Sequence, residues 1–423
     1  MPGEQHHSKQ QRTVAIIGAG IVGVSTAIWL QREGFDVILI DRAGPAGGTS
    51  YGNGGVLASC SVVPVTVPGL VRKAPAMLID QRQPLFLKWG YLGRLMPWLV
   101  RYLRHANARD AERIARALTP IVGDSLADHQ ALSTGTGAEG FVVPSDYLFV
   151  YRDRPHFEGD AFAMGLRRQL GFSWDELEGK GFADYDPAFS PKLTYAARFP
   201  GHGRITDPGA YVNALADYAV RQGARLIRAD VTGIVKDQGR VVALKASGDS
   251  ISCDEVVLAT GAWSKPLAAQ LGVKVPLESE RGYHLDLWGA SVRPRAPVMV
   301  AAGKFVATPM EGRLRLAGIV EFGGLKSAPS RPPFDLLKSQ IVAALPGLTW
   351  DRAEEWMGHR PAPSDSIPVI GPAPQLKGAW LGFGHHHVGL TGGPKTGRLL
   401  AQMIAGRAPN IDVAPYSPSR FAG

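Results

Sequence analysis

TVAIIGAGIVGVSTAIWLQREGFDVILID, the stretch from Thr13 to Asp41, decides the fold. An apolar run leads into Gly18, Gly20 and Gly23, a helix-like run follows, and a second apolar run ends at Asp41. In this context the glycines allow a tight turn, a close approach of backbone to a pyrophosphate, and close packing of helix on strand. The helix N-terminus favours phosphate charge, and the acid can accept hydrogen bonds from ribose hydroxyls. The stretch predicts a Rossmann-like, dinucleotide-binding domain.

A second glycine-rich stretch, GPAGGTSYGNGG, runs from Gly44 to Gly55. A domain that binds NAD has no evident need of it. A flavin dinucleotide does, because its ring and pyrophosphate pass close to backbone. Hydrogen-bond donors for it are expected at Gly47, Gly48, Thr49, Ser50 and Asn53. A flexible surface loop is the alternative interpretation.

Two later segments, Ala224 to Val235 and Asp254 to Ser264, are expected to be short apolar strands with a polar turn between them near 237–239. They could form a simple hairpin. The helix-like run from Pro208 to Gln222 that precedes them instead suggests a nucleotide domain resumed after an insertion. The second segment contains ATG, whose small residues let a strand end close over a nucleotide.

Seven motifs, in order, resemble the FAD-dependent D-amino-acid dehydrogenase and glycine oxidase family, and the dehydrogenase branch most. They are GAGIVG, the acid at Asp41, GGTSYGNGG, ADVTGIV, VVLATGAWS, GHRPAPSDSIPVIGP and GFGHHHVGLTGGPKTG. The resemblance implies an α/β plus α+β fold. A Rossmann-like FAD domain with a parallel sheet would be interleaved with a substrate domain of mixed antiparallel sheet and helices. The FAD domain is expected at 12–75, 200–280 and 355–410, the substrate domain at 76–199 and 281–354, and tails at 1–11 and 411–423.

The resemblance also implies which residues hold FAD. They are Gly18, Gly20, Ile21, Val22, Gly23, Asp41, Arg42, Gly48, Thr49, Ser50, Asn53, Gly54, Gly55, Val231, Thr260, Gly261, Gly389, Leu390, Thr391 and Gly392. Sarcosine oxidases, which are relatives, link FAD to a cysteine near the motif that corresponds to Gly358–Ser364. This chain has no cysteine there, so non-covalent FAD is expected, and a histidine link stays open.

Oxidation of an amino acid by a flavin needs a cationic clamp for the carboxylate and a pocket that presents the Cα–H bond for hydride transfer. In the resembled family an arginine before the proline of GHRP binds the carboxylate, which makes Arg360 the candidate clamp. A salt bridge with Glu354 or Glu355 is the structural alternative. The expected product is an imino acid that hydrolyses to a 2-oxo acid, or a cyclic imine from proline or hydroxyproline. Oxidation of glycine- or sarcosine-type amines and NAD-dependent dehydrogenation are alternative activities.

Tyr283 or His284, in RGYHLDL, could face the substrate or serve as packing. Glycine oxidase-like members have a tyrosine where this chain is expected to place Phe305, which suggests an apolar wall and disfavours a substrate as small as glycine.

The three histidines of GFGHHHVGLTGG raise the question of a metal site. On an extended segment His385 and His387 would share a face and His386 would point away, and no acidic or cysteine ligand lies at metal spacing. No metal is therefore expected. Pro394 is expected in the first turn of a helix, and the amides from Leu390 to Gly393 would face the flavin. Relatives place an arginine near the substrate at the position of His387, so His387 is a candidate substrate contact.

Composition narrows the remaining classes. Cys60 and Cys253 are too few for a disulfide framework, and the first twelve residues lack the apolar part of a secretory signal, so a cytoplasmic protein with a disordered N-terminal tail is expected. The net charge is +9, yet the basic residues are scattered, which argues against a nucleic-acid partner. A non-catalytic, RNA-associated flavoprotein is the rival that this charge suggests.

The most lipophilic stretch, Leu85 to Leu103, is interrupted by charges and is not expected to span a bilayer. Pro97 is expected to split it into two helices. One apolar helical face is predicted, from Leu85, Trp89, Leu92, Met96, Leu99 and Leu103. Burial of this face is the expectation. Peripheral contact with the inner face of the membrane is the alternative and would suit a quinone as electron acceptor, but the residues do not decide between oxygen and a quinone or other carrier.

Overall fold

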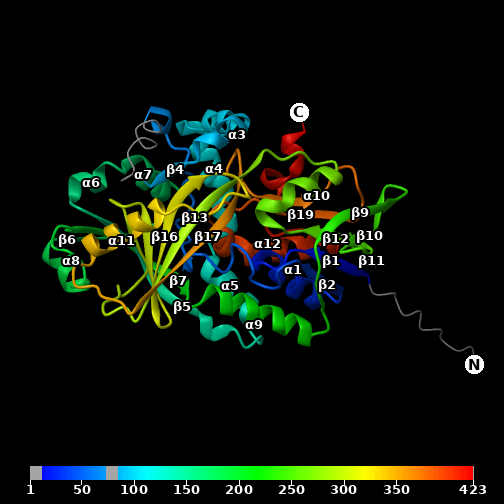
Figure 1. Ribbon diagram of the computed structural model, residues 1–423, viewed down its shortest axis with the longest axis horizontal. Coiled ribbons are helices and arrows are strands. Elements are labelled where there is room, and N and C mark those ends of the chain that lie inside the picture. The colour runs from blue at the N-terminus through cyan, green and yellow to red at the C-terminus, as the bar shows by residue number, and fades with distance from the viewer. Residues whose placement is uncertain (1–11, 73–83, 423) are drawn as a thin grey trace, which may run out of the picture.

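The computed structural model describes residues 12–72 and 84–422, which form two main sheets side by side along the long axis of the molecule (Figure 1). The first has the strand order β18-β19-β12-β1-β2-β8, and within it only β18 runs antiparallel to its neighbour. Its strands are β1 (Thr13–Ile17), β2 (Asp36–Asp41), β8 (Arg225–Arg228), β12 (Glu255–Leu258), β18 (Val369–Pro372) and β19 (Ala379–Phe383).

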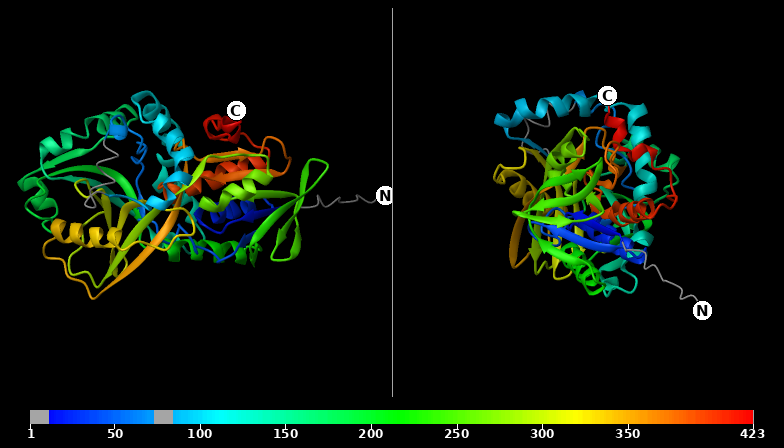
Figure 2. Two further views of the ribbon diagram at one scale, coloured as in Figure 1. Left: turned by 45° about the horizontal axis from the view of Figure 1, so that its top comes forward. Right: turned by 90° about the vertical axis from the view of Figure 1, so that its right-hand side faces the viewer.

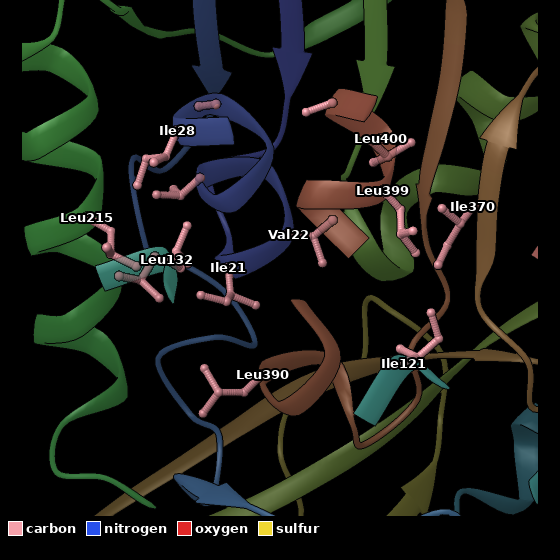
Figure 3. Close-up of a cluster of buried hydrophobic side chains, with 14 of the residues drawn as sticks. Ile21, Val22, Ile28, Ile121, Leu132, Leu215, Ile370, Leu390, Leu399 and Leu400 are labelled. Atoms are coloured by element: carbon pink, nitrogen blue, oxygen red, sulfur yellow. The ribbon is translucent and has the colours of Figure 1, made fainter. Parts of the chain in front are cut away.

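Both faces of this parallel sheet are covered, as its continuously apolar strands require. Val14 and Ile16 belong to a core with helices α1 (Ile21–Arg32), α9 (Pro208–Arg221) and α12 (Gly389–Ile404), part of which Figure 3 shows. Ala15 and Ile17 belong to a second core on the other face. That face is covered by α10 (Ser264–Gln270) and by an antiparallel sheet of β9 (Val231–Asp237), β10 (Arg240–Ala246) and β11 (Asp249–Ser252).

The two later apolar segments do not form a hairpin with each other. β12 pairs in parallel with β1, with Ile16 opposite Val257, so the nucleotide sheet resumes after the insertion as the sequence suggested. The segment from Ala224 to Val235, expected to be one strand, divides into β8 beside β2 and β9 in the small antiparallel sheet.

The second main sheet is mixed and mostly antiparallel, with the main order β17-β13-β16-β15-β14-β5-β7-β3 and with β4 and β6 attached to β16 and β7. Its strands are β3 (Val56–Leu57), β4 (Leu85–Leu87), β5 (Val142–Tyr151), β6 (Asp175–Glu178), β7 (Tyr195–Ile205), β13 (Leu277–Trp288), β14 (Val298–Val300), β15 (Phe305–Met310), β16 (Arg313–Phe322) and β17 (Arg352–Pro363). Among the described residues, the helices α3 (Leu92–Arg104), α6 (Arg154–Glu158), α7 (Ala161–Gln169), α8 (Lys180–Tyr185) and α11 (Pro332–Ala344) accompany it. Helix α4 (Ala108–Val122) packs on α12 in the first core, and α5 (Ser125–Ser133) contacts both α12 and β7. The expected fold class is confirmed.

Long strands connect the two halves of the molecule (Figure 2). The expected limits at 199/200, 280/281 and 354/355 fall inside β7, β13 and β17, so the chain changes halves along a strand and not in a linker. The limit at 75/76 and the tail 1–11 lie outside the described residues. The C-terminal tail is packed, because the buried Tyr416 donates to the Ala117 carbonyl at 2.6 Å. The division into two domains at these limits remains a proposal.

The apolar helical face predicted for Leu85–Leu103 was wrong. The segment begins as a strand and a short 3-10 turn (Trp89–Tyr91), and α3 buries Leu95, Trp98 and Tyr102, whereas the expected core residue Trp89 is 62% exposed. Pro97 lies inside the single helix α3, where the carbonyl left without an amide partner belongs to the exposed Gly93. In the described part of the chain, no helix has the length and apolar character needed to cross a bilayer.

Candidate active site

A cavity of about 990 Å³ lies between the carboxyl ends of the parallel strands and the large sheet, where open α/β sheets bind their ligands. Its volume is at the upper end of the usual range for ligand pockets, about 300–1,000 Å³. The expected cofactor residues line it except for Gly23, Gly55 and Gly392. Those that line it are Gly18, Gly20, Ile21, Val22, Asp41, Arg42, Gly48, Thr49, Ser50, Asn53, Gly54, Val231, Thr260, Gly261, Gly389, Leu390 and Thr391.

The first glycine loop is shaped by backbone contact. Gly18 has a φ of +107°, and a Cβ there would lie 2.4 Å from the carbonyl oxygen of Ala259 at the end of β12. At Gly23 a Cβ would lie 1.8 Å from the Gly18 oxygen, so this residue brings α1 against the loop and does not face the cavity. The other two expected residues that miss the cavity are also packing positions. A Cβ at Gly55 would meet Met310, and one at Gly392 would meet Ile121.

Asp41 organises the loops around it. Its carboxylate accepts hydrogen bonds from the amides of Ala19 at 2.9 Å, Ala43 at 2.8 Å and Gly44 at 3.1 Å. A carboxylate offers about four acceptor positions, so the expected ribose contact would use only the position that these amides leave. The next residue, Arg42, places its guanidinium over the Trp263 ring, 4.4 Å from the ring centre.

The second glycine-rich stretch is built into the interior and is not a surface loop. Gly52 is buried, and a Cβ there would lie 1.8 Å from the Trp356 ring. The side chains of the stretch tie it to its neighbours. Ser50 Oγ accepts from the Ile21 amide at 3.0 Å, and Thr49 Oγ1 donates to the His359 carbonyl at 2.8 Å. The backbone of the stretch is thereby fixed against both α1 and β17.

Helix α12 starts at Gly389, so Pro394 lies inside it and not in its first turn as expected. The Leu390 and Thr391 amides are in the first turn, which leaves them without partners within the helix, whereas the Gly392 amide bonds the Val388 carbonyl at 2.9 Å. Pro394 has no amide for the Leu390 carbonyl, and His129 Nε2 bonds that oxygen instead, at 2.9 Å. The buried His129 thus supports the helix start that faces the cavity.

These features fit a flavin dinucleotide. The glycine backbone at Gly18 is closed to any side chain, and the amide-bearing first turns of α1 and α12 both meet the cavity. Helix N-termini of this kind attract negative charge.

Arg360 lies on the cavity wall and is free of protein partners. Throughout 12–72 and 84–422, no hydrogen bond or ion pair involves its guanidinium, which lies over Gly282, where a Cβ would be 2.6 Å from Nε. The structural alternative for this residue was wrong, since Glu355 pairs with Arg331 at 2.9 Å and Glu354 accepts from Trp288 at 3.0 Å. An unpaired guanidinium can hold a carboxylate through two parallel hydrogen bonds.

Tyr283, expected either to face the substrate or to serve as packing, lines the cavity, but its hydroxyl is engaged within the protein. It is 1% exposed, and its hydroxyl donates to Glu321 at 2.6 Å and accepts from the Ser330 amide at 2.9 Å, so the hydroxyl is committed to the core of the large sheet. His284 is also occupied, with its Nδ1 3.0 Å from the Gly52 carbonyl oxygen.

The apolar wall was assigned to the wrong residue of β15. Phe305 is fully buried in the core of the large sheet, and Lys304 and Val306 on either side of it line the cavity. Successive side chains of a strand point to opposite faces. A prediction that is shifted by one residue along the strand therefore assigns a core residue to the cavity wall.

The three histidines point to three different places, because His386 has a φ of +54° and the segment is a turn and not a strand. His385 is buried and bonds Thr396 Oγ1 at 2.8 Å, and burial lowers its pKa to about 4. His386 places Nδ1 3.2 Å from Glu280, and His387 is exposed on the cavity lining. Among the residues that the structure describes, no group of three or more His, Cys, Asp or Glu side chains could hold a metal ion.

Several lining residues escaped the sequence analysis. They are Glu280, Tyr147, Phe149, Arg167 and Met299. Each comes from a strand or helix of the large sheet, and no local motif marks it. An acid such as Glu280 is ordinarily exposed, so its place on a strand gave no sign that it is buried.

Comparison with known proteins agrees with this site. Residues 13–403 match the family described as DAO, FAD dependent oxidoreductase. A D-amino-acid oxidase of Bradyrhizobium diazoefficiens is 39% identical over 418 residues, covering 97% of this chain and 99% of that protein. D-amino acid dehydrogenase 2 of Ralstonia nicotianae is 32% identical over 429 residues, covering 96% and 100%.

Solved structures share the fold. Glycine oxidase from Geobacillus kaustophilus has a TM-score of 0.76 at 20% identity, covering 98% of this chain and all of that one. L-proline dehydrogenase from P. horikoshii has a TM-score of 0.74 at 19% identity, covering 97% and 98%. A cavity lined by the dinucleotide fingerprint and an unpaired arginine defines an FAD-dependent oxidoreductase. The chain belongs to the DAO family of these enzymes, and its cofactor is FAD.

Proposed function

We propose that this enzyme oxidises D-amino acids at the α-carbon, cyclic ones such as D-proline and hydroxyproline included. Two relatives that match nearly the whole chain are named for activity on D-amino acids. The observation that carries the proposal is Arg360, a guanidinium on the cavity wall that forms no hydrogen bond or ion pair with the described protein. A small carboxylate is the ligand that satisfies it.

Bound FAD supplies the oxidant by accepting a hydride from the substrate α-carbon. Arg360 holds the carboxylate and thereby fixes the position of the neighbouring Cα–H bond. The side chain would lie against Val306, Met299 and Phe149, and His387 would contact the substrate from the turn before α12. The resulting imino acid hydrolyses to a 2-oxo acid and ammonia. An apolar wall of this kind favours side chains larger than that of glycine.

The cofactor contacts belong to the same proposal. The expected residues that line the cavity would hold FAD without a covalent link, and the first-turn amides of Leu390 and Thr391 would face negative charge, which the N-terminal end of α12 favours. Gly23, Gly55 and Gly392 would act through packing.

Anaerobic mixing of the flavin-loaded enzyme with both enantiomers of a panel of amino acids, proline and hydroxyproline included, tests the function. We expect bleaching of the flavin absorbance by D-amino acids and little by their enantiomers. A flavin that no member of the panel reduces would overturn the proposal.

The electron acceptor, oxygen or a quinone or other carrier, defines a second part of the proposal. Trp89, Met96 and Val100 are exposed large hydrophobic residues, and Arg94 and Arg101 beside them are exposed cations. Such a surface supports peripheral contact with anionic membrane, where quinones dissolve. Flotation with anionic liposomes should carry the wild type and leave a Trp89→Ser, Met96→Ser variant behind. Equal flotation of both, or of neither, would remove this contact from the proposal.

A further inference from the structure

A buried carboxylate lies beside the proposed clamp. Glu280 on β13 is the register partner of Arg360 on β17, and both side chains line the cavity. Glu280 is 4% exposed. In the part of the chain that the structure describes, its carboxylate makes no hydrogen bond and has no arginine or lysine within ion-pair distance. A buried carboxylate without hydrogen bonds is costly to the protein alone.

Among the described groups that face this acid, Arg360 is a cation whose charge acts on the Glu280 carboxylate without forming a hydrogen bond or ion pair with it. Arg360 approaches from β17, His386 comes from the turn after β19, and Tyr102 comes from α3. His387, the next residue of that turn, lines the same cavity. Arg281, the next residue on β13, faces the opposite way and pairs with Glu321 at 2.8 Å.

His386 is the nearest of these groups, with Nδ1 3.2 Å from the Glu280 carboxylate. Its backbone amide bonds the Pro361 carbonyl at 2.9 Å, which fixes the turn to the strand that carries the clamp. Both ring nitrogens are buried without a hydrogen bond in the described structure, and so is the hydroxyl of Tyr102, whose ring stacks on His386. Of these groups His386 lines the cavity together with Glu280, and their unsatisfied polar atoms on one wall indicate a polar ligand that completes them.

Burial separates the protonation behaviour of the two closest groups. It raises the pKa of Glu280 to about 7, a rise that the positive charge of Arg360 limits. It lowers the pKa of His386 to about 3, so the imidazole is neutral at physiological pH. Glu280 is therefore the group on this wall that changes its charge near neutrality.

We infer that Glu280 is a catalytic residue that receives the ammonium proton of the substrate, so that Arg360 and Glu280 recognise the two charges of a zwitterionic amino acid. The inference rests on the proposed function. An α-amino acid carries its carboxylate and ammonium on adjacent atoms, and the neighbouring arginine and glutamate offer the complementary charges. An ammonium nitrogen has no electron pair with which to form the C=N bond, so one proton must leave before the Cα–H bond breaks.

The step balances in atoms and electrons. The N–H bond of the ammonium breaks, and its proton passes to the Glu280 carboxylate, which becomes a carboxylic acid. The freed nitrogen pair forms the C=N bond as the Cα–H bond breaks and the hydride leaves to FAD. The products are an iminium, which water hydrolyses, and a protonated Glu280, which returns its proton to solvent.

The test is the pH dependence of anaerobic flavin reduction in wild type, Glu280→Gln and Glu278→Gln. Glu278 is the matched control, since it lies on the same strand but bonds Tyr91 at 3.1 Å. We expect the wild-type rate at low substrate concentration to rise through about pH 7. At pH 7 the Glu280→Gln rate should fall about a hundredfold, the lower end of a typical general-base contribution. It should recover at high pH as the free substrate loses its own ammonium proton, and Glu278→Gln should follow the wild type.

A loss in Glu280→Gln that is equal at every pH would overturn the inference and leave Glu280 as a counter-charge for Arg360. A Glu280→Gln profile identical to that of the wild type would also overturn it. Either result leaves the proposed function standing, whereas failure of every amino acid to reduce the wild-type flavin would overturn both. Flavin content and thermal unfolding verify that the variants are folded. If the glutamine variant loses flavin, Glu280→Asp replaces it, and a profile without the rise near neutral pH would count against the inference.

Discussion

Replacement of Arg360 by methionine removes the proposed clamp and little else. The guanidinium makes no hydrogen bond or ion pair with the described protein, so the variant breaks no internal bond, and within the protein the lost charge acts on the ionisation of Glu280. Truncation of one partner of a buried charge pair costs about 2–5 kcal/mol. Nearly all of that cost should therefore fall on substrate binding, and kcat/KM should decrease about 30- to 5,000-fold. Arg360→Lys keeps the positive charge but loses the planar pair of N–H donors, so its decrease in kcat/KM should be intermediate.

The assay is stopped-flow reduction of the flavin by a D-amino acid without oxygen, together with flavin content and unfolding temperature. Arg352→Met is the matched control, because Arg352 lies on the same strand β17 with its guanidinium 4.7 Å from the Trp288 ring centre, and it is exposed. We expect wild-type kinetics from the control and unchanged flavin content in all variants. An Arg360→Met enzyme with wild-type kcat/KM would refute the clamp, as would a decrease explained entirely by lost flavin.

Three further predictions concern the cofactor loop and stability. Gly18→Ala should cost about 1–3 kcal/mol in backbone strain and lose flavin, because its Cβ would also lie 2.4 Å from a carbonyl oxygen. Gly44 has a similar φ of +95°, but a Cβ there would meet no atom within 4 Å. The Gly44→Ala variant should therefore keep its flavin absorbance. Burial raises the pKa of Glu280 from 4.5 to about 7, so its contribution to stability is present below pH 4.5 and is lost as pH rises through 7. Glu280→Gln should then be more stable than wild type by about 3 kcal/mol at pH 8 and equally stable at pH 4. If the variant and the wild type have the same denaturant midpoint at pH 8 as well as at pH 4, the prediction is contradicted. Burial lowers the pKa of His129 from 6.5 to about 4. The unfolded state therefore binds the proton first, and the free energy of unfolding should fall by about 1.4 kcal/mol for each pH unit as the pH is lowered from 6.5 to 4. His129→Asn should remove that share of the slope, and an unchanged slope in urea unfolding at several pH values would speak against it.

The parts of the site that the sequence predicted well are those that depend on local geometry. Gly18 and Gly20 and the acid at Asp41 occur within one strand, turn, helix and strand, so their spacing already places them together. Arg360 was predicted from its motif, and the structure adds that no described partner competes for it. The motifs also indicated FAD as the cofactor and a mixed large sheet beside the nucleotide sheet.

The errors came from features that depend on strand register and helix docking. Phe305 and Val306 exchange places if the face of β15 is misjudged by one residue. The hydroxyl of Tyr283 is engaged by Glu321, which comes from the neighbouring strand β16. The buried face of α3 is set by Trp98 and Tyr102 docking on the large sheet, which its periodicity did not reveal.

The sequence by itself therefore determined the nucleotide fold and the cofactor and made Arg360 the candidate clamp, because glycines, an acid and an arginine occur there in motifs of short-range spacing. Only the tertiary structure decided that Glu280 lies beside Arg360, since this neighbourhood requires the pairing of strands β13 and β17, about eighty residues apart in the chain. The burial that gives Glu280 its unusual acidity arises from elements that meet only after folding.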